Sequence, residues 1–129
     1  MSATETVVVL GASNNPDRYS NRAVKMLLSH GYAVVPVHPA LEQIEGIPVV
    51  PSLDRVQGPV DTVSVYLSPQ NSQSLTGSLL ALRPERVIFN PGSESEAVKS
   101  ALEAGGIRCI EACTLVLLST GQFATAGRG

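Results

Sequence analysis

The residues best suited to chemistry lie near the N-terminus, in the turn "GASN" (residues 11–14) and just after it. Its glycine allows a sharp turn and a close approach of the backbone to a ligand. Ser13 and Asn14 offer hydrogen-bond donors, and a helix predicted from about Ser20 directs its positive end at them. Arg18 is the only cation before that helix, and a guanidinium is suited to a phosphate. The turn therefore predicts phosphate binding, with an ordinary loop and a solvated arginine as the alternative.

The features that the turn lacks narrow the choice of ligand. It has neither the later glycines of the usual dinucleotide fingerprint nor the lysine of a P-loop, which disfavours magnesium-assisted phosphoryl transfer. A nicotinamide dinucleotide also usually needs an acidic residue after the second strand, to hold the ribose. That strand ends in "PVHP" (residues 36–39), so NAD is disfavoured. His38 is equally consistent with a ribose contact and with a loop histidine that binds nothing.

The other reactive side chains predict little chemistry. Cys109 and Cys113 have only His30 and His38 as possible partners in a zinc site, so we expect two free thiols in or near the core. A pair of Ser13 and His38 is conceivable where two strands end, but no carboxylate follows a strand to orient the histidine. We therefore expect no catalytic residue and no metal.

Five apolar or β-branched runs are expected to form the strands that position these residues. They are Thr6–Leu10, Tyr32–Pro39, Val60–Pro69, Arg86–Asn90 and Ile107–Glu111. A shorter extended piece is expected at Ile47–Val50. Continuous runs of this kind are typical of strands that are buried on both faces of a parallel sheet.

Stretches with helical periodicity separate these runs. The first begins near Ser20. The second follows Ser68 and Pro69, which are suited to the N-cap and first position of a helix. The third follows "PGSESE", in which Ser93 and Glu96 have the spacing of a capping box.

The alternation of strands and helices predicts right-handed crossovers between parallel strands. The expected fold is one α/β domain over residues 1–129, a Rossmann-like doubly wound parallel sheet of about five strands with helices on both faces. The segment "CTLVLLSTGQF" (residues 113–123) fits either a last strand or a buried helix, and residues 124–129 are expected to be a frayed tail. A ligand is expected beyond the carboxyl ends of the strands.

Composition excludes several classes of protein. Charged residues make up 16% of the 129 residues, and the net charge is −2. A general nucleic-acid binder would normally carry an excess of basic residues. No apolar run reaches the length of a membrane span, and the N-terminus lacks the basic start of a secretory signal. We therefore expect a cytoplasmic protein that contacts neither nucleic acid nor membrane.

Three motifs together resemble a known family. The stretches "GASNNPDRYS", "GYAVVPVHP" and "VDTVSVYLSP" resemble those of the small stand-alone coenzyme A-binding domains. These are Rossmann-like proteins that are similar to the nucleotide-binding domain of the succinyl-CoA synthetase alpha subunit. The resemblance extends from about Thr6 to Phe123, and "NPGSE" and "CTLVLLSTG" also match segments found in part of that family.

The resemblance implies a ligand, coenzyme A (CoA), and a role for each matching position. The pyrophosphate would lie against Gly11, Ala12, Ser13 and Asn14, with Arg18 and Ser20 beside it. The adenosine would be bordered by Val37, His38 and Pro39. The adenine or the start of the pantetheine arm would be flanked by Leu67 and Ser68, and the edge of the cleft formed by Asn90 and Pro91.

Two functions remain open on this basis. The first is non-catalytic binding of CoA or an acyl-CoA through its pyrophosphate and adenosine. The second is a small nucleotide-dependent enzyme or subunit that uses NAD(P) or an adenine nucleotide. The histidine that is phosphorylated in the synthetase relatives is carried by a second domain. We expect no such domain in this chain, so that chemistry is not implied. Assembly with a second copy or with a partner enzyme is open for both functions, and residues 113–123 could supply such a surface.

Overall fold

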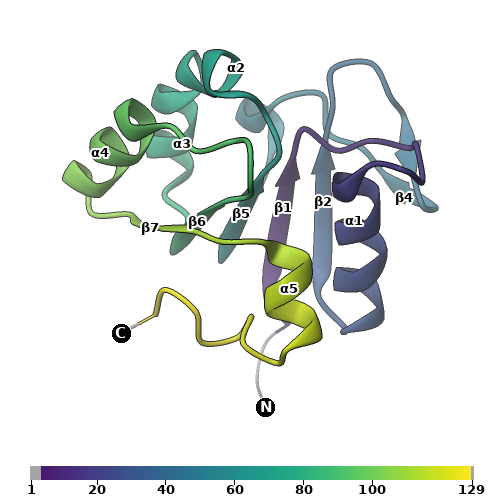
Figure 1. The fold of residues 1–129 in the computed structure, drawn as a ribbon. Helices are drawn as coiled ribbons and strands as arrows, with labels where there is room; N and C mark the ends of the chain where they lie inside the picture. The colour runs from purple at the N-terminus through teal and green to yellow at the C-terminus, as the bar shows by residue number, and fades with distance from the viewer. Residues whose placement is uncertain (1–3, 129) are drawn as a thin grey trace.

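The computed structural model describes residues 4–128 and contains one sheet of five parallel strands in the order β2-β1-β5-β6-β7 (Figure 1). These strands are β1 (Thr6–Leu10), β2 (Ala33–Val37), β5 (Thr62–Val65), β6 (Arg86–Phe89) and β7 (Arg108–Glu111). A separate antiparallel pair consists of β3 (Gln43–Ile44) and β4 (Ile47–Pro48). The helices are α1 (Tyr19–Ser29), the 3-10 helix η1 (Leu53–Arg55), α2 (Pro69–Gln73), α3 (Thr76–Leu82), α4 (Glu96–Ala104) and α5 (Thr114–Ser119).

The sheet confirms the predicted Rossmann-like α/β fold, and its central strands show why their sequences are continuously apolar. In β1, Val7 and Val9 pack into the core cluster on one face, whereas Val8 and Leu10 pack into the cluster on the other. All four side chains are buried. Burial on both faces removes the alternation of polar and apolar residues that a half-exposed strand would show.

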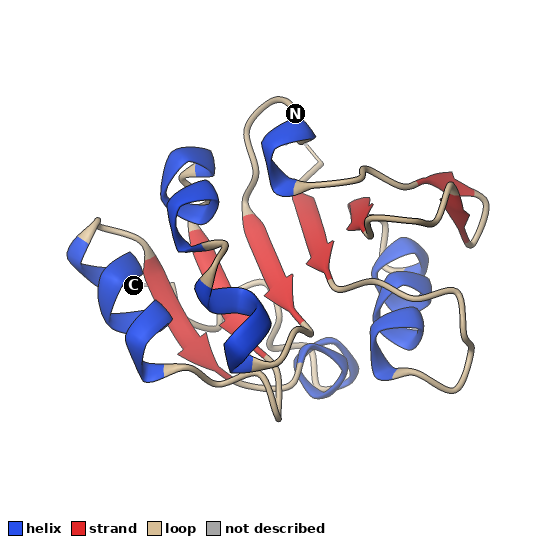
Figure 2. Ribbon diagram, turned by 90° about the horizontal axis from the view of Figure 1, so that it is seen from above, coloured by secondary structure: helices blue, strands red, loops and turns tan. Residues whose placement is uncertain are grey.

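Helices cover both faces of the sheet, as seen in Figures 1 and 2. Helices α1 and α5 lie on one face, where Val24 and Leu117 join the core cluster of Val7 and Val9. On the other face, α3 and α4 supply Leu79 and Leu102 to the second cluster. Within residues 4–128, no helix is long and apolar enough to cross a membrane.

The order of the strands reverses at β1. From β1 the chain first crosses to β2 on one side, and it later returns to β5, β6 and β7 on the other side. In sheets of this kind, the loops after the two strands that flank such a reversal move apart and leave a crevice. The reversal therefore predicts a ligand site at the carboxyl ends of β1, β2 and β5.

Two helical segments differ from the sequence-based prediction, one in where it starts and one in being divided. Ser93 was expected to cap α4, but the N-cap is Ser95, whose hydroxyl accepts a hydrogen bond from the N–H of Val98 at 3.3 Å. The Ser93 hydroxyl instead donates to the carbonyl oxygen of Asn90 at 2.7 Å and closes the loop after β6. The single helix expected after Ser68 is divided into α2 and α3.

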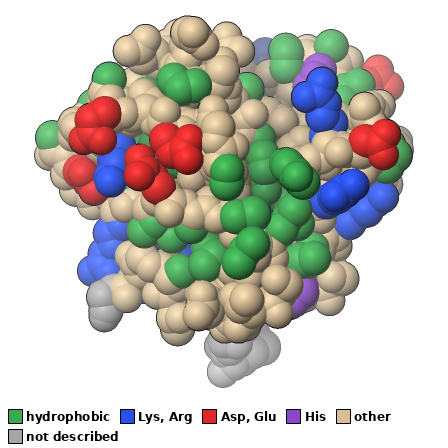
Figure 3. Space-filling model, viewed as in Figure 1, with side chains coloured by type: hydrophobic (Ala, Val, Ile, Leu, Met, Phe, Trp, Pro, Cys, Tyr) green, Lys and Arg blue, Asp and Glu red, His purple; other side chains and the backbone are tan. Residues whose placement is uncertain are grey.

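The segment that the sequence left undecided, residues 113–123, contains helix α5. Leu117 and Leu118 are buried against the sheet, whereas Val116 is 54% exposed. Figure 3 shows hydrophobic side chains gathered on this face of the molecule, and half-buried Ile110 and Ala112 adjoin the helix in the chain. Whether a second copy covers this surface stays a prediction.

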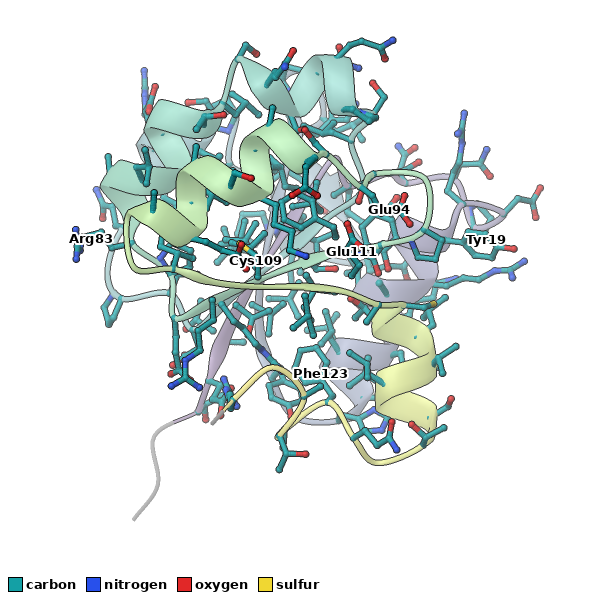
Figure 4. The ribbon with its side chains drawn as sticks, turned by 60° about the vertical axis from the view of Figure 1, so that its left-hand side comes forward. Tyr19, Arg83, Glu94, Cys109, Glu111 and Phe123 are labelled. Carbon is teal, nitrogen blue, oxygen red and sulfur yellow. The ribbon has the colours of Figure 1, made fainter. Side chains whose placement is uncertain are left out.

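The segment 124–128 makes contacts that differ from the expected frayed tail. Arg128 forms ion pairs with Glu5 and Glu85, both at 2.8 Å, and the carbonyl oxygen of Ala126 accepts a hydrogen bond of 2.6 Å from Arg86. Figure 4 shows Phe123 at the start of this segment, turned inward toward the body of the protein. Gly129 lies outside the described residues.

Candidate functional site

A cavity of about 610 Å³ lies at the carboxyl ends of β1, β2 and β5, where the order of the strands reverses. In Figure 1 this is the end to which the arrowheads of β1 and β2 point. The residues that line it are Leu10, Gly11, Ala12, Ser13, Arg18, Ser20, Val37, His38, Pro39, Pro51, Ser52, Leu53, Tyr66, Leu67, Asn71, Ser74 and Leu75. The cavity therefore lies where the topology predicts a ligand.

Most of the residues that the sequence singled out meet in this cavity. Nine line it: Gly11, Ala12, Ser13, Arg18, Ser20, Val37, His38, Pro39 and Leu67. Four others lie outside the lining: Asn14, Ser68, Asn90 and Pro91. Ser68 is the N-cap of α2, and Asn14 and Pro91 are exposed.

Asn90 is a structural residue rather than part of the cavity wall. Its side-chain Nδ2 donates to the Ser64 hydroxyl and to the carbonyl oxygen of Val65, both at 2.9 Å. Its Oδ1 accepts from the N–H of Thr114 at 2.8 Å, and the Ser64 and Thr114 hydroxyls are 2.8 Å apart. Because every polar atom of this amide has a protein partner, Asn90 joins β5, β6 and α5 and leaves no donor for a ligand.

Residues 11–13 and the start of α1 form one side of the cavity, and we call residues 11–14 the phosphate turn. The opposite wall of the cavity was not predicted from the sequence. This wall comes from residues 51–53 before and within η1, from Tyr66, and from Asn71, Ser74 and Leu75 of the α2–α3 region. These residues carry no motif. The one usable signal was positional, since Tyr66 directly precedes the predicted residue Leu67.

Gly11 brings the backbone of the turn close to β5. Its φ of +85° lies in the left-handed region, which glycine adopts without strain. A Cβ atom at this position would lie 2.9 Å from Cδ2 of Leu67 and 3.2 Å from the carbonyl carbon of Tyr66. Glycine is therefore required here both by backbone conformation and by space.

The turn and the start of α1 leave several donors free for an anion. Among the described residues, the N–H groups of Ser13 and Asn14 make no backbone or side-chain hydrogen bond. Helix α1 has Arg18 at its N-cap, no side-chain cap and no acidic residue in its first turn. Because the first N–H groups of a helix have no partner within it, this end presents positive charge to the cavity.

Asn21, on helix α1, holds the phosphate turn in place through hydrogen bonds. Its Nδ2 donates to the carbonyl oxygen of Ser13 at 3.0 Å and to Glu45 Oε2 at 3.2 Å. The Asn21 side chain is fully buried, and Glu45 lies in the tight turn between β3 and β4 at φ +51°. The asparagine thereby joins the turn after β1 to the small hairpin.

His38 is oriented by the backbone that follows it. Its Nδ1 accepts hydrogen bonds from the N–H groups of Ala40 at 3.0 Å and Leu41 at 3.2 Å. The neutral ring therefore carries its proton on Nε2, which is left to donate to a ligand. No carboxylate orients this ring among its described hydrogen-bond partners, unlike the histidine of a catalytic triad.

Tyr66 lines the cavity, but its phenol oxygen is buried in the interior near Ser64 and Thr114. Burial raises the pKa of Tyr66 to about 12, so the phenol keeps its proton throughout the physiological range. Its Oη is buried and has no hydrogen-bond partner within the described residues. Because this oxygen is shielded from solvent, Tyr66 contributes shape to the cavity wall rather than a hydrogen-bond donor.

The lining as a whole is suited to binding an anion. It contains one full positive charge, Arg18, and neither aspartate, glutamate nor cysteine. Within residues 4–128, no group of three or more His, Cys, Asp or Glu side chains is placed to hold a metal ion. The arrangement therefore provides donors and one cation rather than an acid–base pair.

Comparison with known proteins assigns the chain to a family. The sequence profile of the CoA binding domain matches residues 5–119, nearly the whole chain. The chain belongs to the CoA-binding domain family. The resemblance noted in the motifs is thereby confirmed.

Relatives of this CoA-binding domain include proteins of similar size. The uncharacterized protein YneT of Bacillus subtilis (strain 168) is 32% identical over 77 residues, which make up 60% of this chain and 55% of that protein. The chain thus matches only about half the length of this curated relative. The structure of cell-free ID.343 from Thermus thermophilus has a TM-score of 0.86 at 30% identity, over 93% of this chain and 91% of that one.

Two further structures share the fold. A crystal structure of an uncharacterized protein has a TM-score of 0.87 at 38% identity, over 95% of this chain and 100% of that one. The dinucleotide-forming acetyl-coenzyme A synthetase 1 of Ca. Korarchaeum cryptofilum, in complex with phosphate and ADP, has a TM-score of 0.73. At 19% identity over 84% of this chain and 25% of that one, this last likeness shows the fold alone.

Proposed function

We propose that this CoA-binding domain binds coenzyme A, free or acylated, in the cavity at the carboxyl ends of β1, β2 and β5, and does not itself catalyse a reaction. The observation that supports the proposal most strongly is the uncapped start of α1 beside the one cation of the cavity. The diphosphate of CoA is an anion of the kind that a helix N-terminus and an arginine attract.

The proposed pose follows the chemistry of the walls. The diphosphate lies against the free N–H groups of Ser13 and Asn14, the start of α1 and the guanidinium of Arg18. The adenosine lies beside Val37, His38 and Pro39, where folds of this kind place a ribose. The pantetheine arm leaves past Leu67 toward the wall formed by Asn71, Ser74 and Leu75.

The non-catalytic part of the proposal rests on the missing acid–base groups. A thioester hydrolase or acyl transferase needs a positioned nucleophile and a base that is itself oriented. His38 is held by two backbone N–H groups, and the cavity lining contains no carboxylate and no thiol. The cavity therefore lacks the groups that would activate the Ser13 hydroxyl.

Isothermal titration of the purified protein with CoA, acetyl-CoA, NAD and ATP tests the ligand. We expect CoA and acetyl-CoA to bind at micromolar or lower concentration and NAD to bind weakly or not at all. Arg18→Ala is expected to weaken CoA binding by roughly 1–3 kcal/mol, through loss of a charge-assisted hydrogen bond. Arg22→Ala is the matched control, because Arg22 lies outside the cavity and stacks on Tyr19.

Three results would contradict the proposal or a part of it. Binding of NAD at micromolar concentration with none of CoA would show that the cavity holds a different nucleotide. Release of free thiol from acetyl-CoA in the presence of the protein, faster than in buffer alone, would show that the domain is catalytic. Equal losses in Arg18→Ala and Arg22→Ala would remove Arg18 from the site.

A further inference from the structure

The two edges of the sheet differ in how far their backbone is closed to another strand. At the β2 edge, Pro36 has no N–H to expose, and its carbonyl oxygen accepts a hydrogen bond from the N–H of Val50 at 2.9 Å. The N–H of His38 donates to the carbonyl oxygen of Val50 at 3.1 Å. Proline and a covering segment are two ways in which proteins keep an edge strand from pairing with another chain. The β2 edge is therefore protected near its carboxyl end.

The β7 edge has neither kind of protection within residues 4–128. β7 contains no proline and is last in the order of strands. Ala112, just after it, donates its N–H to the carbonyl oxygen of Phe89 on β6 at 3.1 Å. Because the backbone groups of successive strand residues point to alternate sides, those of Cys109 and Glu111 point away from β6. The N–H and carbonyl groups of these two residues make no hydrogen bond to another described residue.

This edge lies on a face that also exposes apolar side chains. Figures 1 and 4 show β7 crossing the front of the molecule, with no other drawn segment in front of it. Figure 3, in the view of Figure 1, shows hydrophobic side chains gathered on this face. Val116 is 54% exposed, and Ile110 and Ala112 are half-buried. A bare strand edge beside apolar side chains is typical of a surface that another chain covers.

Antiparallel pairing of two β7 strands uses all of the free backbone groups in one register alone. Cys109 of each copy then lies opposite Glu111 of the other, and each such pair exchanges two hydrogen bonds. A shift that sets Cys109 opposite itself brings Glu111 against Ile107, whose N–H already donates to the carbonyl oxygen of Leu102 at 3.0 Å. The opposite shift sets Glu111 against itself, and like charges directly opposite are destabilising.

The same register also fits the side chains. Ile110, which belongs to the core cluster on the α5 face, lies opposite itself in a pair whose side chains are close. On the α4 face, Glu111 of the second copy lies opposite Cys109, whose thiol is 4.0 Å from the carbonyl oxygen of Lys99. Lys99 thus offers an opposite charge to that carboxylate, and Glu103 lies one helical turn further along α4.

We propose that two copies of this chain pair through their β7 strands, antiparallel and with Cys109 of each opposite Glu111 of the other, so that one sheet runs through both copies. The occupant of the edge is a second copy, because the free backbone groups and the facing side chains match under one two-fold axis. The inference goes beyond the proposed function, since no residue of β7 lines the cavity and each copy keeps its own site.

The mass in solution, measured by sedimentation equilibrium over a dilution series, tests the pairing. We expect the wild type to reach the mass of two chains at high concentration. Glu111→Pro removes an outward N–H without touching the ladder to β6, and it is expected to give the mass of one chain. Glu111→Gln is the matched control. It removes the charge but keeps the N–H, and its dissociation constant should rise by no more than about fivefold.

A cysteine scan along β7 tests the register. The two Ile110 Cα atoms of the proposed pair are roughly 4.5 Å apart, within reach of a disulfide. In a background of Cys109→Val and Cys113→Val, Ile110→Cys is expected to join the copies under mild oxidation, seen as a doubled mass on a non-reducing gel. Ala112→Cys is the matched control, because the two Ala112 positions lie at opposite ends of the paired strands, too far apart for the same bond.

Three results would overturn the inference. The mass of one chain at every concentration of the wild type would leave the edge to a strand of a different protein. A two-chain mass that persists in Glu111→Pro would place the interface elsewhere, for example on α5. If Glu111→Pro does not fold, the scan decides alone. No disulfide in Ile110→Cys, or as much in Ala112→Cys, would refute the register and with it the pairing.

Discussion

Gly11 is the residue on which the shape of the proposed site depends most directly. Gly11→Ala introduces a Cβ atom 2.9 Å from Leu67 and forces alanine to a φ of +85°. We expect a loss of roughly 1–3 kcal/mol of stability from the strained backbone and an additional loss from the clash. CoA binding should fall by more than stability alone explains, because the turn must move. Urea unfolding and calorimetry measure the two effects.

Gly46 provides the control for this prediction. It also has a positive φ, +79°, but a Cβ atom there meets nothing within 4 Å. Gly46→Ala should therefore show the backbone strain without the clash, and it should leave CoA affinity nearly unchanged. If both variants lose CoA binding equally, the close approach of Gly11 to Leu67 is not what shapes the site.

Residue types predicted part of the site for a physical reason. Gly11, Ser13 and Arg18 were recognisable because a turn after a buried strand exposes its backbone, and such residues then face a ligand. Asn90 occupies the equivalent place after β6 and was predicted on the same ground, but its amide is consumed by hydrogen bonds to β5 and α5. Sequence alone does not reveal which side-chain amides already have partners, because those partners lie far away in the chain.

Cys109 predicts a dependence of stability on pH. Its thiol packs between β7 and α4, seen in Figure 4, and burial raises its pKa from 9.0 to about 11, with Glu103 acting in the same direction. Above pH 9 the unfolded chain releases this proton before the folded protein does. The free energy of unfolding should therefore fall as pH rises from 9 toward 11.

Denaturant unfolding at pH 8, 9 and 10 measures this effect. The Cys109→Val variant keeps a buried apolar side chain of similar size and removes the titration, so its stability should decline less over this range. Measurements stop at pH 10 because Tyr66, with a pKa raised to about 12, begins to contribute in the same direction above that pH. Identical slopes in the two proteins would show that the thiol is not desolvated.

At the scale of elements, the start of α4 is a feature that the sequence misplaced. Both Ser93 and Ser95 are suited to an N-cap, and the capping-box spacing to Glu96 favoured the first. In the structure the Ser93 hydroxyl donates a hydrogen bond to the carbonyl oxygen of Asn90. The N-cap is therefore Ser95, two residues after the predicted one. Local spacing could not decide between the two serines because the competing acceptor belongs to the loop after β6.

Ser95→Ala tests the position of this cap. The change leaves one N–H at the start of α4 without its side-chain partner, and we expect a loss of about 1 kcal/mol in the free energy of unfolding. Ser100→Ala, on the exposed side of the same helix, should change stability by less than about 0.5 kcal/mol. A loss in Ser100→Ala as large as that in Ser95→Ala would argue against the cap.

The wall of the cavity that includes residues 51–53 was not predicted, and the reason lies in the short element that forms it. Periodicity identified the long elements, but it did not show that the single turn η1 brings Leu53 and Ser52 over the ends of the strands. Short 3-10 turns leave little trace in a sequence because they bury few residues at regular spacing. Strands were easier to predict, although they are shorter than their apolar runs: Val60–Pro69 contains β5 only at Thr62–Val65.

At the scale of the whole molecule, the C-terminal segment covers a buried cation, Arg86. This residue lies at the amino ends of the strands, and the cavity lies at their carboxyl ends. Arg86 is fully buried, its Nε donates to the Thr62 hydroxyl at 2.8 Å, and its guanidinium lies 4.4 Å from the centre of the Phe123 ring. Burial lowers the pKa of Arg86 to about 10, so it remains charged near neutral pH. The carbonyl oxygen of Ala126 is its remaining hydrogen-bond acceptor within the described residues.

Removal of residues 124–129 should therefore destabilise the protein. The loss of the Ala126 acceptor leaves a buried guanidinium less satisfied, which costs about 1–3 kcal/mol by urea unfolding. CoA affinity should stay unchanged, because Arg86 and Thr62 begin their strands and the proposed site lies at the other ends. Arg128→Gln, which removes the partly exposed ion pairs with Glu5 and Glu85 and a hydrogen bond to the carbonyl oxygen of Ala124, should cost less than about 1 kcal/mol.

Two outcomes would contradict this account of the C-terminal segment. An unchanged unfolding midpoint after truncation would mean that Arg86 does not depend on the segment. A loss in Arg128→Gln equal to that of the truncation would mean that the ion pairs, rather than the cover over Arg86, hold the segment in place.

The topology was the most predictable property of the molecule. Alternating strands and helices allow few arrangements, because crossovers between parallel strands are right-handed and each buried strand needs helices on both faces. The reversal of strand order at β1 then fixes where a ligand can lie. The path of residues 124–128 was not predictable, since polar and small residues contact Arg86 through a backbone carbonyl that any sequence would offer.

The most direct test of the central claim is a map of backbone amide shifts in ¹⁵N-labelled protein as CoA is added. The account predicts that the largest shifts occur at Gly11, Ser13 and Ser20, at His38, and at Leu67 and Leu75, with little change around Arg86 and α5. Shifts that are absent at saturating CoA, or that concentrate at Leu82 and Val56 in the shallow hollow between η1 and α3, would show that the cavity at the reversal of the sheet is not the CoA site.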